Sequence, residues 1–514
     1  MKKNVLPFFL ALSLFSVAFL YFSTSAPGLV WDPPQTGALL ASILDFKYKT
    51  LSIESPLFYL VGLVFSSIFS SSIGFARVMN LFSVAAALSF LLVFFLTTKR
   101  LSGSDKAAFL STTSLAVFPF FWDFALYANY HIFSLLCIWL FLFFLIRAQN
   151  YFRFIFPALL FFSLSFLTTF YFVIFSVPLA VFIIENRKRI DLKKGLSLFL
   201  ILVIFLVTLF GVGRYLDFDF GSYFSLYIPK GSIFSCLGEN LFSYFVGYFQ
   251  GFFPVIFVLS LVGFLFWEGE SLVLFRSLSI AFLALVFTSF SQFEGVYLPL
   301  TSVIFLYAGV GFAVVWNIIS ELFNTEIGVA LENKVFVLVF RLKKKAKLIK
   351  HFSLGILIFL VALAIFWKFS ERAANVSRKE DREAAQYGNS AWERLEKKSA
   401  ILVGSSRYLS VLSYMKAVQR DKDVLLIHSL SDILRLEASS HRYANIAVPS
   451  SDIYYANVPG INAWYNRLIT ENKKNWSFYM TLERPSQETN KKVGSWGEYP
   501  LVAQEPLYKI KTGN

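Results

Sequence analysis

Residues 76–97 read ARVMNLFSVAAALSFLLVFFLT, and Thr98, Lys99 and Arg100 follow directly. An α-helix rises about 1.5 Å per residue, so about 20 apolar residues are needed to cross the hydrocarbon core of a bilayer. The stretch meets that length and ends in two basic residues, which favour the cytoplasmic side of a membrane. It therefore predicts a transmembrane helix whose C-terminal end lies in the cytoplasm.

Apolar runs of this kind recur along residues 1–370. The candidate runs are 5–23, 56–73, 76–97, 107–121, 132–146, 154–184, 195–212, 241–266, 275–291, 297–318 and 352–369. With 57% hydrophobic and only 15% charged residues, the chain cannot bury its apolar surface in one soluble core. The sequence therefore predicts an α-helical polytopic membrane domain.

Two of these runs need interpretation. Run 154–184 is too long for one crossing, and Thr168–Thr169 with Pro178 indicate a break, so we expect two crossings there. Run 56–73 is rich in serine and has no strong anchor, so it suits a helix lying along the membrane interface. Run 5–23 follows Lys2 and Lys3 and resembles a signal peptide, but its length favours an uncleaved first helix.

The basic residues fix the predicted topology. If 56–73 does not cross, the basic clusters at 99–106, 147–153, 187–194, 276 and 341–350 all fall on the cytoplasmic side. The remaining segments are poor in basic residues and then face outward; they are 24–75, 122–131, 214–240 and 292–296. This predicts about eleven crossings, an interfacial helix, a cytoplasmic N-terminus and an external C-terminal part.

Neither the net charge of +15 nor the two cysteines indicates a further functional site. The basic residues sit between apolar runs as topology signals, so no nucleic-acid partner is expected. Cys137 lies in an apolar run and Cys236 in a loop, which implies neither a disulfide framework nor a metal site.

After Phe369 the composition becomes charged and mixed. Short apolar runs alternate with helix-like segments: 400–403, 424–427 and 445–448 for strands, and 406–419 and 432–439 for helices. This alternation predicts a small α/β soluble domain over residues 371–514, outside the membrane.

Acidic residues at the predicted outer face are the candidates for chemistry, because charge at membrane depth is costly. Asp32 follows the interfacial residue Trp31 and precedes the stiff pair Pro33–Pro34. Asp123 ends a later apolar run on the same face. Each aspartate, taken alone, is also compatible with an ordinary polar group at a helix end.

The external loop 214–240 mixes aromatic and charged residues. Arg214 and Lys230 are candidates to bind a phosphate, since Arg pairs bidentately with phosphate and Lys acts as a point charge. Such a loop is equally compatible with an amphipathic connector. No Gly-rich phosphate loop and no His-Glu-x-x-His sequence is present.

The order of these features resembles the GT-C glycosyltransferases, and among them the bacterial relatives of the transmembrane-type protein O-mannosyltransferases. The stretches that carry the resemblance are Ala26–Pro27, Trp31–Thr36, Ser55–Tyr59, Phe121–Trp122, Val296–Pro299 and the start of the C-terminal domain at 400–404 and 419–424. Asp32 matches the family's motif aspartate. Gln35 replaces the motif glutamate, and residues 51–54 replace the family's His-Pro-Pro-Gly.

The resemblance implies a polyprenyl-phosphate-linked sugar as donor, of a hexosyl or mannosyl type, and a protein or glycan hydroxyl as acceptor. Asp32 would be the catalytic base. Asp123 would be a second carboxylate for a divalent metal or for the acceptor, and Arg214 or Lys230 would hold the phosphate beside Trp31. Asp123, Arg214 and Lys230 are inferred from their positions and not from a motif.

Two other functions stay open at this point. A non-catalytic relative that binds a lipid-linked glycan or a protein partner would explain Gln35 and the missing His-Pro-Pro-Gly. A transporter or flippase would need charged or broken helices at the membrane midplane, which only the Thr168–Thr169 region suggests. In the preferred hypothesis the chain lies in a bacterial cytoplasmic membrane and acts on its outer face.

Overall fold

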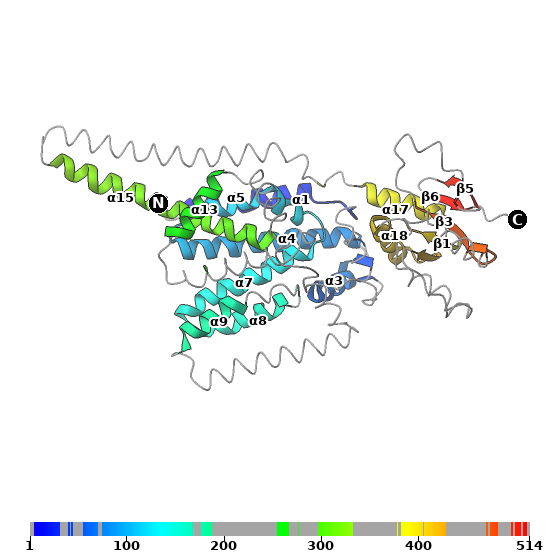
Figure 1. The fold of residues 1–514 in the computed structure, drawn as a ribbon, viewed down its shortest axis with the longest axis horizontal. Helices are drawn as coiled ribbons and strands as arrows, with labels where there is room; N and C mark the ends of the chain where they lie inside the picture. Colours follow the sequence, from blue (N-terminus) through cyan, green and yellow to red (C-terminus); the bar gives the residue numbers. More distant parts are fainter. Residues whose placement is uncertain are drawn as a thin grey trace, which may run out of the picture. The chain divides into compact units, whose positions relative to one another are not determined.

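The protein is described by a computed structural model (Figure 1). The residues that the structure describes are 5–30, 37, 40, 41, 43, 44, 55–69, 74–166, 168, 176–187, 254–266, 276, 297–332, 378, 382–403, 406–427, 469, 470, 473–481, 495, 496, 499–504 and 507–510. They belong to two compact units. Unit 1 comprises Met1–Ser25, Ser52–Phe58 and Asn80–Arg378, and unit 2 comprises Ala26–Leu51, Tyr59–Met79 and Lys379–Asn514.

Unit 1 is a helical bundle. Its helices are α1 (Val5–Thr24), most of α4 (Phe75–Ser102), α5 (Asp105–Ala116), α6 (Pro119–Ala125), α7 (Tyr130–Asn150), α8 (Ile155–Phe166), α9 (Ser176–Glu185), α13 (Pro254–Phe266) and α15 (Tyr297–Glu332), with a 3-10 turn η2 (Phe152–Phe154) before α8. Helix α13 packs along α15, α8 along α7, and α5 against α15 (Figure 1).

Three helices among the described residues are long and apolar enough to cross a membrane. They include Phe75–Ser102, Tyr130–Asn150 and Thr301–Ile318, and a fourth span results if α5 and α6 together form one broken crossing. The chain is thus an integral membrane protein. The predicted total of about eleven crossings stays a prediction, because the runs 195–212, 352–369 and most of 275–291 lie outside the described residues.

The apolar run 107–121 forms two helices and not one. Helix α5 ends at Ala116, α6 begins at Pro119, and the two helices are bent by 66°. Proline lacks an N–H and forces the preceding residue out of the helical region, and Phe118 accordingly has φ −67° and ψ 121°. Hydropathy alone does not register this change of direction.

The predicted break within 154–184 is confirmed. Helix α8 ends at Phe166, the backbone N–H of Thr168 turns back to the carbonyl of Ser165, and a separate helix α9 begins at Ser176. Run 297–318, by contrast, underestimates its helix, since α15 continues to Glu332.

Aromatic rings fill the centre of unit 1. Phe90, Phe94 and Trp139 are buried, and the Trp139 ring lies 4.9 Å from that of Phe94 and 5.9 Å from that of Phe90. The indole N–H of Trp139 donates to the hydroxyl of Ser302 at 2.9 Å, so this buried polar atom is paired. By contrast, Phe15 on α1 is 70% exposed, as expected for a side chain that faces lipid.

Helices α13 and α15 cross at two glycines. A Cβ on Gly311 would come 1.9 Å from the carbonyl oxygen of Leu259, and one on Gly263 would come 2.0 Å from that of Tyr307. Small residues permit such close backbone approach between membrane helices, where packing must replace the hydrophobic effect. Glycine is therefore required at both positions.

The C-terminal part of unit 2 contains a six-stranded mixed sheet. Its strands are β1 (Lys398–Leu402), β2 (Asp423–Ile427), β3 (Ser477–Met480), β4 (Ser495–Trp496), β5 (Tyr499–Gln504) and β6 (Leu507–Ile510), in the order β2-β1-β3-β6-β5-β4. Strands β2, β1 and β3 are parallel, and the remaining pairs are antiparallel. Helices α17 (Glu383–Arg394) and α18 (Ser406–Val418) pack against each other beside it.

These elements agree with the predicted strands at 400–403 and 424–427 and with the predicted helix at 406–419. The expected elements at 432–439 and 445–448 lie outside the described residues. The predicted domain boundary between residues 370 and 371 stays a prediction.

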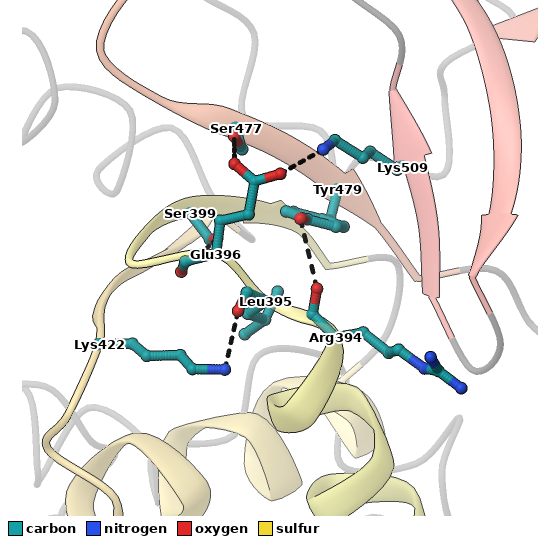
Figure 2. Close-up of polar contacts among 8 residues, drawn as sticks. All are labelled: Arg394, Leu395, Glu396, Ser399, Lys422, Ser477, Tyr479 and Lys509. Atoms are coloured by element: carbon teal, nitrogen blue, oxygen red, sulfur yellow. Dashed lines mark hydrogen bonds and ion pairs between the residues drawn. The ribbon is translucent and has the colours of Figure 1, made fainter.

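Polar contacts close the start of the sheet (Figure 2). Glu396 accepts hydrogen bonds from Lys509 on β6 and from Ser477 on β3, the latter at 2.5 Å. These contacts hold the pKa of Glu396 below its usual value, and the same contact raises the pKa of Lys509. Below them, the ammonium of Lys422 donates to the carbonyls of Trp392 and Leu395 at 2.6 and 2.7 Å, which satisfies the end of α17.

Unit 2 also includes the segment that follows α1. A Cβ on Gly37 would come 2.5 Å from Oγ and 2.8 Å from the carbonyl oxygen of Ser410 in α18. Arg420 donates to the carbonyl of Leu44 at 3.2 Å, and Arg77 donates to that of Ala26 at 2.6 Å. The segment from Ala26 to Leu51 and the C-terminal sheet domain therefore form one compact body.

Helix α3 (Pro56–Phe69) covers the run that was predicted to lie at the interface. Its 14 residues give a length of about 21 Å, which is less than the hydrocarbon core of a bilayer. Val64 and Ile68 are 57% and 60% exposed. Length and exposure both agree with a helix that lies on the membrane.

Candidate functional site

Asp123 stands at the end of α6, and the fold of this short helix sets its direction. Pro119 occupies the first turn, where its missing N–H costs nothing. Trp122, the preceding residue, is buried and donates its indole N–H to the hydroxyl of Thr24 at 3.2 Å. Asp123 is the next residue and therefore lies on a different face of the helix from Trp122. Its side chain is 28% exposed.

Arg378 is the partner of Asp123. Its Nε donates to Oδ1 at 2.9 Å and its Nη2 donates to Oδ2 at 3.2 Å, so both carboxylate oxygens are engaged. The Arg378 guanidinium also lies over the ring of Tyr127, 5.3 Å from its centroid. This bidentate geometry is the strongest form of an ion pair between side chains, and it fixes orientation as well as charge.

The backbone of Arg378 is held as well. Its N–H donates to the carbonyl of Thr24 at 2.9 Å. Thr24 is the last residue of α1, so this bond satisfies one of the carbonyls that a helix leaves unpaired at its C-terminus. One threonine thus contacts both Trp122 and Arg378.

The connection from α6 to α7 is fixed by buried polar side chains of α4. Asn80 accepts from the N–H of Ala128 at 2.7 Å, and Ser83 accepts from the N–H of Asn129 at 2.9 Å. Asn129 then caps α7 by accepting from the N–H of His131 at 2.8 Å. The loop that follows Asp123 therefore has a defined conformation.

The structure tests only part of the predicted site. Asp123 is described, whereas Trp31, Asp32, Arg214 and Lys230 lie outside the described residues, and their roles stay predictions. Within the part of the chain that the structure describes, no group of three His, Cys, Asp or Glu side chains is arranged to hold a metal ion. The divalent metal also stays a prediction.

Sequence reasoning missed Arg378. It lies 255 residues from Asp123 along the chain, between other basic residues at 372, 379 and 382. Nothing in its sequence context distinguishes it from those neighbours. The only available signal is its place after the last apolar run, on the side of the membrane where Asp123 is predicted.

Comparison with known proteins gives the fold. No family model and no curated protein matches the sequence. Among solved structures, ArnT from Cupriavidus metallidurans bound to undecaprenyl phosphate is similar over 99% of this chain and 98% of its own, with 14% identity and a TM-score of 0.61. The same protein in the apo state matches 98% of this chain and 97% of its own, with 13% identity and a TM-score of 0.60.

At this level of identity, the likeness establishes architecture over the whole chain. The chain therefore shares the fold of ArnT, and the GT-C architecture expected from its motifs agrees with this fold. The finer likeness to relatives of the O-mannosyltransferases stays a prediction.

Proposed function

We propose that this protein transfers a sugar from a polyprenyl-phosphate donor to an acceptor hydroxyl on the extracytoplasmic face of the membrane. The observation that carries the proposal is the likeness over nearly the whole length of both chains to a structure that holds undecaprenyl phosphate. The match of Asp32 to the motif aspartate of the family that the sequence resembles also supports it.

The reaction needs a base and a stabilised leaving group. Asp32 takes the proton from the acceptor hydroxyl, whose oxygen forms a bond to the anomeric carbon of the sugar. The bond between that carbon and the phosphate oxygen breaks, and the polyprenyl phosphate leaves with the electron pair. Arg214 or Lys230, beside Trp31, stabilises the phosphate charge.

Asp123 is the second carboxylate of the proposed site. It orients the acceptor or contributes to binding a divalent metal, which would neutralise phosphate charge when bound. Its partial exposure leaves it accessible, while Arg378 fixes its orientation. The proposed sugar is a hexose such as mannose, the proposed acceptor is a protein or glycan, and the proposed location is a bacterial cytoplasmic membrane.

A second candidate is a non-catalytic relative that binds a lipid-linked glycan or a protein. Gln35 in place of the motif glutamate and the Leu51–Glu54 stretch in place of His-Pro-Pro-Gly favour it. A transporter or flippase is the third candidate. These alternatives share the fold and differ from the first in whether Asp32 is needed for turnover.

The experiment is the Asp32→Asn variant in cells from which the gene has been deleted, with the glycans measured by mass spectrometry. We expect a loss of about 100-fold or more in the glycan that depends on the gene, at an equal amount of membrane protein. Asp105→Asn is the matched control, because Asp105 pairs with Lys99 at 2.7 Å on the predicted cytoplasmic side. Normal glycan with Asp32→Asn, beside its loss on deletion, would exclude the enzymatic proposal.

A further inference from the structure

Arg378 is the residue at which the chain leaves unit 1, and it is fixed there at three points. Its side chain binds both oxygens of Asp123, its guanidinium lies over Tyr127, and its N–H donates to Thr24. The charged end of a surface arginine usually extends into water. The Arg378 side chain, by contrast, is only 21% exposed. The geometry is that of a built contact.

The contacts of Arg378 meet at the end of α1. Thr24 closes that helix, and the segment that bears Asp32 begins directly after Ser25. The same Thr24 receives Trp122, the neighbour of Asp123. Four hydrogen bonds and one ring contact, all within unit 1, therefore join the end of α1, the end of α6 and Arg378.

We propose that Arg378 is a positioning residue for the glycosyl transfer, which acts through Asp123 by orienting its carboxylate. The inference rests on the proposed function. Arg378 does not touch the reacting atoms in this role. Displacing a reacting group by about 1 Å costs about 100-fold in rate, so a contact that only orients a carboxylate has a measurable effect.

The competing role is direct binding of the donor phosphate, since a guanidinium also forms bidentate contacts with phosphate. The two roles differ in how the losses of activity caused by changing Arg378 and by changing Asp123 combine in the double variant. If Arg378 acts through Asp123, removing it has little further effect once Asp123 is changed. If it binds phosphate on its own, the losses multiply and the affinity for the lipid phosphate falls.

The test is a double-mutant cycle of Asp123→Asn, Arg378→Gln and the double variant in the gene-deleted cells. We expect each single variant to lower the glycan yield by about 10- to 100-fold, and the double variant to match the poorer single variant within about twofold. Arg378→Lys, which keeps the charge and one donor, should restore part of the yield. Arg382→Gln, an exposed arginine four positions on, should have no effect.

Two measurements on the purified full chain complete the test. The dissociation constant for undecaprenyl phosphate should change by less than about twofold in Arg378→Gln, and the unfolding temperature in detergent should stay near that of Arg382→Gln. The positioning role would be overturned if the losses of glycan yield in the two single variants multiplied in the double variant. It would also be overturned if Arg378→Gln bound undecaprenyl phosphate about tenfold more weakly. Full yield with Arg378→Gln while Asp32→Asn is inactive would overturn this inference alone, and an active Asp32→Asn would instead remove the proposed function.

Discussion

Glu396 illustrates what single residues contribute to this fold. It follows α17 and accepts from two strands that are far apart in sequence, β3 through Ser477 and β6 through Lys509 (Figure 2). The side chain is 53% exposed, so the Lys509 pair contributes only about 0.2–1 kcal/mol. The contact therefore favours the pairing of β3 with β6 in the middle of the sheet more than it stabilises the domain.

The lowered pKa of Glu396 predicts a weak acid sensitivity of this sheet. Its contribution to stability is complete above the pKa of an unfolded glutamate, about 4.3, and is lost as the pH falls through the lower folded value. We expect peptides that cover β3 and β6 to lose hydrogen-exchange protection below about pH 4.3, after correction for intrinsic exchange. The Glu396→Gln variant should already lack that protection at neutral pH. Its hydrogen-exchange protection in β3 and β6 should therefore not differ between pH 6 and pH 3.5. An unchanged difference in the variant would refute this assignment.

Asp123 shows where prediction from sequence ends at the residue scale. The apolar run before it and its predicted side of the membrane made it a candidate. Its partner Arg378 was not predictable, because an ion pair across 255 residues depends on how α1, α6 and the chain after the last run fold together. Local patterns carry no information about that.

At the scale of elements, the sequence predicted helices well and their interruptions unevenly. Thr168 marked a real break, whereas the bend at Pro119, inside the apolar run 107–121, was not predicted. Hydropathy reports how apolar a stretch is, while proline changes its direction without changing that average. The strands β1 and β2 were predictable because each is a short buried run between turn residues.

The contact between Gly37 and α18 gives an element-scale prediction. Gly37→Val would place its side chain against both Oγ and the backbone of Ser410, and the backbone cannot move aside. We expect a loss of about 1–3 kcal/mol in stability, seen as a lower unfolding temperature of the full chain, together with a lower glycan yield.

Gly28→Val is the matched control for Gly37→Val. A Cβ on Gly28 has no heavy atom within 4 Å, although Gly28 lies in the same segment. Equal effects of the two substitutions would mean that the packing on α18 does not stabilise this segment.

At the scale of the whole molecule, composition and charge distribution already separated a membrane part from a mixed C-terminal part. The structure and its likeness to ArnT confirm an integral membrane protein, and the fold agrees with the expected GT-C architecture. The inclusion of the segment from Ala26 to Leu51 in one body with the C-terminal sheet was not predictable, since it rests on tertiary contacts such as that between Arg420 and Leu44. The outward placement of the C-terminal part stays a prediction from the basic clusters.

In the proposed function, this chain consumes a polyprenyl-phosphate-linked sugar. The most direct measurement is the pool of such lipids, extracted and quantified by mass spectrometry from cells with the gene, without it, and with Asp32→Asn in its place. We expect one polyprenyl-phosphate sugar to accumulate in both the deletion and the variant, and to return to its normal amount with the native gene. An identical pool in all three strains would contradict it.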